Sequence, residues 1–394
     1  MHSAEWTPHH PQLFYLPIIV ILVFYVNDIF TKDMIMRIKS IDYLRGLMSL
    51  SIVLYHFTTT FISRGIDSST PLGRLGIYGV SAFYVISGMA MYLAHRSDIW
   101  SIGKYLHFIF RRFLRLAPVY WLAIVIYTSF MLYYYGYVNI SAWTYVQNIF
   151  LTFGVTGPTE YFIMGGWSIG NEVVFYLFLP LFILLCRNTL ASIILLSASV
   201  GLLFYCSFSY LDPSISLVKQ WAEYINPLNQ IYFFTCGIVI AKMFLNHAGK
   251  NKEISLLMIV VLTIAFCAYP ASGDLINVST NFNKIVFSLI TILVCLFFFL
   301  IGDIDRIAII SKPLKFLGDI SYPLYLLHGV SFLYFNKLYM TKEMPLQGVI
   351  AGGVVLLAIL FAASWICHIS IERPIIGLSK MKLSSLSFAK FKQI

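Results

Sequence analysis

The feature that most limits what this chain can fold into is a series of long apolar stretches. A helix needs roughly 20 mostly apolar residues to cross a bilayer, and stretches of this length follow one another with short connections. The sequence therefore predicts an all-α, polytopic transmembrane bundle. Ten core spans are expected at residues 41–63, 76–95, 113–136, 167–186, 189–209, 227–246, 254–271, 284–302, 322–340 and 348–370.

Composition excludes a soluble domain. Only 11% of the 394 residues are charged and 59% are hydrophobic, whereas a soluble domain carries about 25% charged residues. The net charge of +10 does not indicate a nucleic-acid partner, because the basic residues form short clusters between the apolar stretches. Basic residues in these positions are typical of cytoplasmic connections in membrane proteins. The lipid bilayer is thus an expected partner, and nucleic acid is not.

The distribution of Lys and Arg predicts the orientation. Alternate connections, together with the two ends of the core, contain 21 of the 27 basic residues, at 32–45, 96–115, 187, 242–252, 306–315 and 373–392. The positive-inside rule places these segments in the cytoplasm. Both ends of the ten-span core are therefore expected there, including the C-terminus.

Three segments are expected along the chain. Residues 37–376 form the membrane core, and residues 377–394 form a basic cytoplasmic tail suited to anionic lipid headgroups. Residues 1–36 contain a further apolar stretch, Leu13–Phe30, with no Lys or Arg before it. This stretch is either an eleventh helix with its N-terminus outside, or translation begins at Met34 or Met36.

The six cysteines lie within or beside apolar stretches, and none shows a CxxC or metal-type spacing. Packing is the preferred interpretation. No disulfide framework, metal site or permanently bound cofactor is expected.

Ionisable residues inside a membrane are costly, so each is a functional candidate. Arg45 and His56 are eleven residues apart in the first span, which places them within roughly 20° of one another around a helix and about 16 Å apart along it. Asp42 precedes Arg45 by three residues and can pair with it. A polar stripe is therefore predicted from the cytoplasmic surface to the membrane centre, although His56 and Arg45 could also serve packing and anchoring.

The connection at 96–115 carries a cluster of arginines, Arg111, Arg112 and Arg115. These residues either mark the cytoplasmic side or form a clamp for a phosphorylated ligand, since arginine forks match phosphate geometry. In the fourth span, Glu172 follows Trp167 and needs a partner or a water-filled cavity. His328 is a second histidine in the middle of a span, and alone it is more often structural.

Taken together, these residues resemble the membrane-bound acyltransferase 3 family, which includes O-antigen and Nod-factor acetylases. Five motifs match in order from about Ile41 to Pro374. They are Asp42-Tyr43-Leu44-Arg45-Gly46 with His56, Phe83-Tyr84-Val85-Ile86-Ser87-Gly88, Arg111-Arg112-Phe113-Leu114-Arg115 through Pro118 to Trp121, Trp167-Ser168 through Glu172 to Tyr176, and Ser321-Tyr322 to His328 followed by Ile371-Glu372-Arg373-Pro374.

The resemblance implies transfer of an acyl group, usually acetyl from acetyl-CoA, onto a hydroxyl of a cell-envelope glycan or glycolipid in the bacterial inner membrane. It implies catalytic roles for His56, Arg45 and Glu172, with neutral His56 acting as general base or covalent acyl carrier. Arg45 and the arginine cluster would hold the donor's phosphates. Acceptor contacts are expected from the remaining polar and aromatic candidates, Trp167, Ser168, Asn171, His328 and Asp42.

Three positions depart from the usual pattern of the family. Gly170 and Asn171 stand where Ser and Val are common, and Val173 replaces a frequent second Glu. A paired carboxylate is therefore not expected in this span.

Buried ionisable residues also mark transport pathways, so a glycan or acyl-metabolite transporter or flippase is the main alternative. The sequence shows neither an inverted repeat nor matching Gly/Pro-broken helices, which such transporters often contain. A catalytically silent scaffold is disfavoured by the presence of His56, Arg45 and Glu172.

Overall fold

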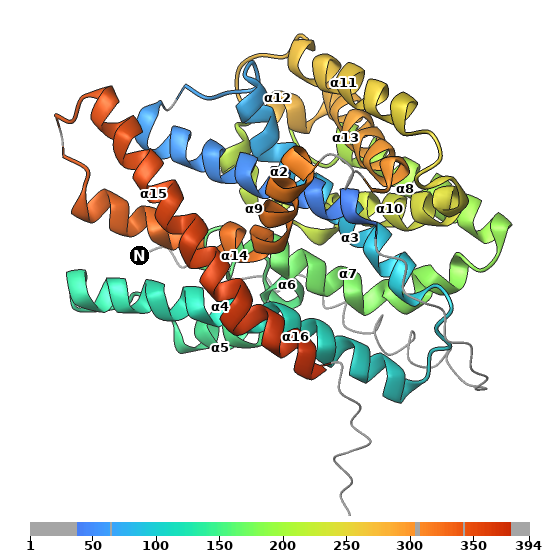
Figure 1. Ribbon diagram of the computed structural model, residues 1–394, viewed down its shortest axis with the longest axis horizontal. Coiled ribbons are helices and arrows are strands. Elements are labelled where there is room, and N and C mark those ends of the chain that lie inside the picture. Colours follow the sequence, from blue (N-terminus) through green and yellow to red (C-terminus); the bar gives the residue numbers. More distant parts are fainter. Residues whose placement is uncertain (1–37, 64, 304–307, 342, 380–394) are drawn as a thin grey trace, which may run out of the picture.

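The computed structural model describes residues 38–63, 65–303, 308–341 and 343–379, and all the regular structure in these ranges is helical. The apolar stretch Leu13–Phe30 and most of the basic tail lie outside the described residues. Each of the ten expected ranges falls on one long helix (Figure 1). These helices are α2 Lys39–Phe57, α3 Pro71–His95, α4 Ile102–Tyr135, α7 Gly166–Leu185, α8 Thr189–Phe208, α10 Ile231–Phe244, α11 Lys252–Ala268, α13 Asn281–Ile301, α14 Ala308–Leu338 and α15 Leu346–Cys367.

Shorter helices connect the long ones: α5 Ala142–Phe150, α6 Phe153–Thr156, α9 Trp221–Tyr224, α12 Ile276–Ser279 and α16 Arg373–Ser379. Among the described residues, six helices are long and apolar enough to cross a membrane: Pro71–His95, Ile102–Tyr135, Gly166–Leu185, Thr189–Phe208, Asn281–Ile301 and Leu346–Gly377. The chain is therefore a multi-pass helical membrane protein, as predicted.

The number of ten spans stays a prediction. Charged side chains make α2 and α14 more polar, and α10 and α11 are shorter than 18 residues. Two helices begin much earlier than expected. α4 starts at Ile102 rather than 113, with the side chain of Ser101 accepting a hydrogen bond from the Lys104 backbone, and α14 starts at Ala308 rather than 322. In both cases the additional turns carry lysine or arginine, so apolar stretches alone could not reveal them.

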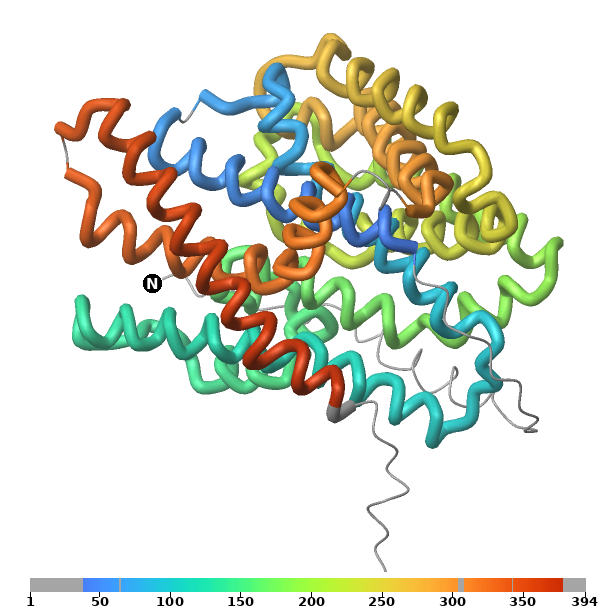
Figure 2. The backbone as a smooth tube through the Cα atoms, viewed as in Figure 1, coloured from blue at the N-terminus to red at the C-terminus, as the bar shows by residue number. Residues whose placement is uncertain are grey.

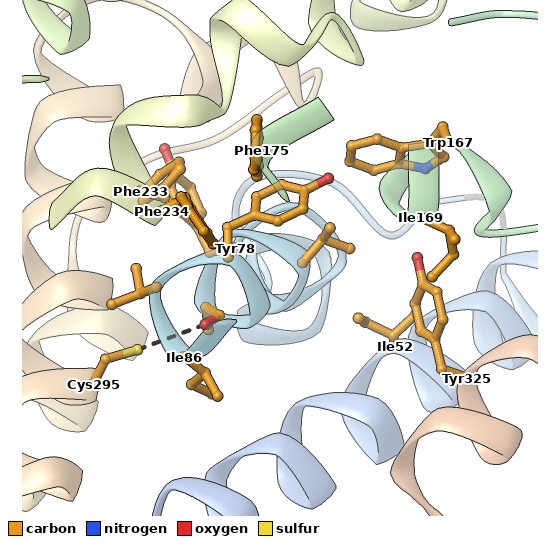
Figure 3. Packing of buried hydrophobic residues seen from close by; sticks show 14 of the residues in the cluster. Ile52, Tyr78, Ile86, Trp167, Ile169, Phe175, Phe233, Phe234, Cys295 and Tyr325 are labelled. Atoms are coloured by element: carbon orange, nitrogen blue, oxygen red, sulfur yellow. Dashed lines mark hydrogen bonds between the residues drawn. The ribbon is translucent and has the colours of Figure 1, made fainter. Parts of the chain in front are cut away.

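Four helices form the centre of the bundle. α2 packs along both α14 and α3, and α3 packs along α10. Figure 3 shows buried side chains such as Tyr78 and Ile86 of α3 pointing outward into the surrounding helices. α14 contains Pro323, which cannot donate a backbone hydrogen bond, and the helix changes direction along its length (Figure 2).

Glycines allow two of these contacts to be very close. A Cβ atom on Gly88 of α3 would lie 2.0 Å from the backbone oxygen of Phe234 on α10, and one on Gly237 would lie 2.1 Å from that of Val85. A Cβ on Gly46 of α2 would similarly lie 2.6 Å from the backbone nitrogen of Gly318 on α14. Small residues commonly permit such backbone contact between membrane helices. They fix α2, α3, α10 and α14 as one packed unit.

The C-terminal part of the fold closes one end of the bundle. α15 continues through a π-helical turn, His368–Glu372, into α16. α16 packs against α4, as Figure 1 shows. This places Glu372 and Arg373 beside the basic first half of α4.

Arg74 of α3 is only 2% exposed and joins three segments. Its guanidinium donates hydrogen bonds to six backbone carbonyls, those of Ser68, Ser69, Phe266, Cys267, Tyr269 and Ala271, at 2.6–3.4 Å. Several of these carbonyls belong to the end of α11, where helix carbonyls lack partners within the helix. The sequence showed Arg74 only as a basic residue in an outer connection.

Replacing Arg74 with alanine is expected to lower the free energy of unfolding by about 3 kcal/mol, because buried carbonyls lose a charged donor. Thermal unfolding of the purified protein measures this effect. The exposed Lys219 supplies a control, since Lys219→Ala removes the same charge and should leave the melting temperature nearly unchanged. Equal melting temperatures for the two variants would contradict the structural role given to Arg74.

Asp67 helps to hold the same connecting segments together. Its carboxylate accepts hydrogen bonds from Ser69 and from the backbone of Gly273, and these bonds hold its pKa below the ordinary value. A lowered pKa in the folded state adds stability at neutral pH, and that stability is lost as the pH falls through the folded-state pKa.

Candidate functional site

Two adjoining cavities form the candidate site. The larger, called here the mouth cavity, has a volume of about 620 Å³, and the smaller, the inner cavity, has about 90 Å³. They adjoin because five residues line both: Arg45, Ala90, Met91, Arg112 and Arg115. The sequence-predicted arginines therefore stand at the junction between them.

The mouth cavity is strongly charged. Besides the three shared arginines, its lining contains Asp42, Lys315, Asp319, His368, Glu372 and Arg373. The last three come from the π-helical turn, at its first and last residues, and from the start of α16, and both segments pack against α4. Five cationic side chains against three carboxylates make this an environment suited to an anionic ligand.

The inner cavity combines Glu172 with hydroxyl groups. Ser87 donates a hydrogen bond of 2.7 Å to the Glu172 carboxylate and lies 3.2 Å from the Tyr176 hydroxyl. The Ser168 hydroxyl is 2.8 Å from that of Tyr325. All five side chains line the cavity. Its interior thus offers one carboxylate and several hydrogen-bonding hydroxyls beside three guanidinium groups.

The three arginines differ in their partners. Arg45 forms the expected salt bridge with Asp42 at 2.8 Å. Among the described residues, neither Arg112 nor Arg115 forms a salt bridge. The Arg112 guanidinium lies over the rings of Phe108 and Tyr176, and its buried Nε atom has no hydrogen-bond partner. Two of the three guanidiniums thus have no direct ion pair among the described residues, although carboxylates such as Glu172 and Glu372 line the same cavities.

His56 and His328 form a stacked pair, with ring centroids 5.3 Å apart. The Nδ1 atom of His328 lies 2.5 Å from the backbone oxygen of Tyr325. Because a carbonyl only accepts hydrogen bonds, this nitrogen carries the ring proton. The opposite Nε2 atom therefore has a lone pair, and it is buried with no hydrogen-bond partner. The sequence did not predict that α2 and α14 would bring these two histidines together.

Tyr325 stands between the cavities and the histidine pair. Its side chain lines the inner cavity, and its ring centroid is 5.9 Å from that of His328. Its hydroxyl donates to the backbone oxygen of Gly165 and contacts Ser168. Neither His56 nor His328 belongs to the cavity lining. The pair is therefore next to the inner cavity but behind an aromatic side chain.

The fourth expected span is α7, and its candidate residues lie on two different sides of this helix. Ser168 and Glu172 line the inner cavity, on the side of the arginines. Trp167 instead packs among Tyr84, Trp221 and Tyr224, and Asn171 donates to Tyr84 and to the backbone of Ile225. At 100° per residue, Trp167 and Glu172 differ by about 140° around the helix. The two side chains thus have different surroundings, and their roles toward the acceptor stay predictions.

Other sequence candidates also differ in placement. Arg111 lines neither cavity, whereas Arg112 and Arg115 line both.

Near Trp167, the Tyr161 hydroxyl accepts a hydrogen bond from Trp221. Burial raises the pKa of Tyr161 and this hydrogen bond opposes the shift, so the residue stays a neutral phenol.

Several site residues were not singled out from sequence, although signals for them existed. Ser87, Tyr325 and Arg373 lie inside recognised motifs, but a motif does not say which of its residues face a cavity. Lys315 lies among the turns of α14 that precede the apolar stretch. His95 contacts both Asp98, three residues later, and Arg112, and the i,i+3 spacing of His95 and Asp98 was the only available signal.

Comparisons with known proteins agree with the resemblance. The chain is 24% identical over 323 residues to a putative acetyltransferase of Acidianus two-tailed virus, covering 80% of this chain and 87% of that protein. It is 25% identical over 341 residues to the O-acetyltransferase OatA of Staphylococcus aureus (strain NCTC 8325 / PS 47), covering 78% of this chain. This match spans only 53% of OatA, about half of its length.

A family model provides the broadest match. The model described as an acyltransferase domain, Acyl_transf_3, matches residues 38–369, which include every residue of the inner cavity and the histidine pair. The chain therefore belongs to the acyltransferase 3 family of membrane proteins.

Proposed function

We propose that the protein is an O-acyltransferase that moves an acyl group, with acetyl expected, from acyl-CoA to a hydroxyl of a cell-envelope glycan or glycolipid. The observation that carries this proposal is the convergence of Arg45, Arg112 and Arg115 on a cavity that continues to Glu172 and adjoins the stacked histidines. We place the protein in the bacterial cytoplasmic membrane, with the mouth cavity and the C-terminus on the cytoplasmic side, where the donor occurs.

The unequal cavities suit the shape of an acyl-CoA. Small-molecule sites usually have volumes of about 300–1,000 Å³, and the mouth cavity of about 620 Å³ falls in this range. In the proposal it takes the phosphorylated nucleotide, whose phosphates pair with the arginines. The inner cavity of about 90 Å³ admits only a slender group, such as the thioester arm.

His56 is the proposed catalytic base. A ring nitrogen takes the proton of the acceptor hydroxyl as its oxygen attacks the thioester carbonyl. The C–O bond forms, the C–S bond breaks, and the CoA thiolate receives the proton. In the covalent variant, the acyl group first moves to the ring nitrogen and then to the hydroxyl. In either case, the Tyr325 ring has to move aside for the thioester to meet the histidines.

Supporting roles follow from the contacts of the other residues. His328 holds the His56 ring by stacking, and its free Nε2 lone pair can accept a proton from the acceptor hydroxyl or from His56. Glu172, oriented by Ser87, contributes a carboxylate inside the inner cavity. The acceptor approaches from the side opposite the mouth cavity. The two relatives, an acetyltransferase and an O-acetyltransferase by name, support acetyl as the group transferred.

Arg112→Ala and Arg115→Ala are each expected to raise the KM for acyl-CoA by about 10- to 100-fold, the range for a lost hydrogen bond to a charged group. The KM for the acceptor should change much less, because acceptor contacts lie elsewhere. Initial rates measured against both substrates provide the test. Lys104→Ala, an exposed position on the same helix, is the control for lost positive charge. A KM increase for the acceptor alone would contradict the donor clamp.

Transfer itself is tested with purified protein in lipid nanodiscs, labelled acetyl-CoA and a panel of envelope glycans. The expected product is a hydroxylamine-sensitive acetyl ester on the glycan, formed only when protein is present. If no acyl donor gives an ester while the glycan crosses the membrane of a proteoliposome, the protein is a transporter and the proposal fails.

A further inference from the structure

Asp98, His95 and Arg112 form a chain of contacts beside the mouth cavity. His95 is the last residue of α3 and is 9% exposed. Its Nδ1 atom lies 2.6 Å from the Asp98 carboxylate, and its Nε2 atom lies 3.4 Å from an Nη atom of Arg112. The rings of Trp100 and Phe108 pack against the imidazole. The imidazole therefore sits in a fixed position between an acid and an arginine.

The chemistry of these groups determines which nitrogen carries the proton. A guanidinium has donors only, so its partner on His95 must be an unprotonated nitrogen with a lone pair. The ring proton is then on Nδ1, where the carboxylate of Asp98 accepts it. This carboxylate–histidine arrangement fixes both the tautomer and the ring plane.

The intervening ring also preserves the charge of Arg112. A carboxylate bound directly to Arg112 would neutralise it, whereas a neutral imidazole holds one amino group without adding negative charge. The Asp98 carboxylate is nearly half exposed and so is screened by water. The Arg112 side chain lines both cavities, and among the described residues its buried Nε has no hydrogen-bond partner.

We propose that His95 and Asp98 are positioning residues that hold the Arg112 guanidinium charged and correctly turned for an anionic group of the acyl donor. This inference rests on the proposed function for the identity of that donor. His95 itself does not touch the donor. It affects donor binding only through Arg112. Substitutions of His95 should therefore change the KM for the donor only when Arg112 is present.

Three substitutions of His95 separate positioning from packing. Glutamine places an oxygen near the Nε2 position and so retains an acceptor for Arg112. Asparagine is shorter and retains only a partner for Asp98, and phenylalanine retains the ring packing without either hydrogen bond. We expect His95→Asn and His95→Phe to raise the KM for acetyl-CoA about tenfold, the scale of one hydrogen bond to a charged group. His95→Gln should change it less than about threefold, with kcat nearly constant throughout.

Two controls complete the kinetic test. His107→Phe removes a histidine that lines neither cavity, and it should leave both kcat and the KM for acetyl-CoA unchanged. In an Arg112→Ala background, His95→Phe should have no further effect on the KM, because the two residues act as one unit. If His95→Gln behaves like His95→Phe, or if the effects with Arg112→Ala simply add, the positioning role is overturned.

A spectroscopic measurement keeps this inference separate from the proposed function. Nitrogen NMR of the full-length protein labelled at histidine, compared with His95→Gln to assign the signal, reports which ring nitrogen is protonated. A proton on Nδ1 supports the Asp98–His95–Arg112 chain even if wild-type protein transfers no acyl group, a result that would overturn the proposed function alone. A proton on Nε2 overturns the inference whatever the activity.

Discussion

Replacing His56 with alanine is expected to lower kcat for acyl transfer by about 10³-fold, within the range for loss of a general base. The reason is that the substitution removes the proposed base, and His328, which stacks on it, is proposed to assist His56 rather than to replace it. The KM for acetyl-CoA should remain nearly constant, because the arginines that bind the donor lie elsewhere. Ester formation under saturating substrates measures the effect.

A matched variant separates chemistry from packing at this position. The His56 ring stacks on His328 and contacts Tyr55, so alanine also removes ring contacts. His56→Phe keeps an aromatic ring there but removes both nitrogens. If ring packing alone mattered, phenylalanine would retain most of the activity. Transfer by His56→Phe at more than a tenth of the wild-type rate would contradict the proposed mechanism.

Replacing Gly88 with leucine is expected to abolish the folded protein. Even the first added carbon would lie 2.0 Å from the Phe234 backbone oxygen, and helix backbones cannot yield as a flexible side chain can. Overpacking of well-packed sites costs about 1–3 kcal/mol, and separating α3 from α10 removes further contacts. Gly88→Ala should therefore already destabilise by at least about 3 kcal/mol.

The yield of monodisperse protein and its thermal unfolding measure the effect of Gly88 substitution. Gly201→Ala on α8 is the matched control, because a Cβ there meets no neighbouring atom within 4 Å. Alanine is the better helix former by about 1 kcal/mol, so this control should be neutral or slightly stabilising. Equal stability of Gly88→Ala and Gly201→Ala would show that α3 and α10 do not pack as described.

The sequence predicted the helical membrane fold because the length of each apolar stretch can be read directly from consecutive residues. It failed at the starts of α4 and α14, where basic turns extend the helices beyond the apolar stretches. The Gly88 motif was recognised, but its physical purpose depends on Phe234, nearly 150 residues later in the chain. Contacts between distant segments have no signature in a single sequence.

The candidate site could be predicted only in part for a similar reason. Helical spacing paired Asp42 with Arg45, and the structure confirms this pair. Periodicity gives the angle between residues on one helix, but not the direction that the helix turns toward its neighbours. The sequence therefore did not show that Glu172 lies with the arginines while Trp167 packs among other aromatic rings. For the same reason, His328 was not expected to stack on His56.

The position of Tyr325 has a consequence for how the cell would use its acyl donor. Its ring separates the histidine pair from the cavities, with the hydroxyl anchored to Gly165 and Ser168. Under the proposed function, a thioester in the inner cavity would stay apart from the histidine base until this ring moved aside. The protein would then remain loaded with donor while no acceptor is present, because the base could not direct water onto the thioester. The arrival of the acceptor, rather than the supply of donor, would set the pace of acyl transfer.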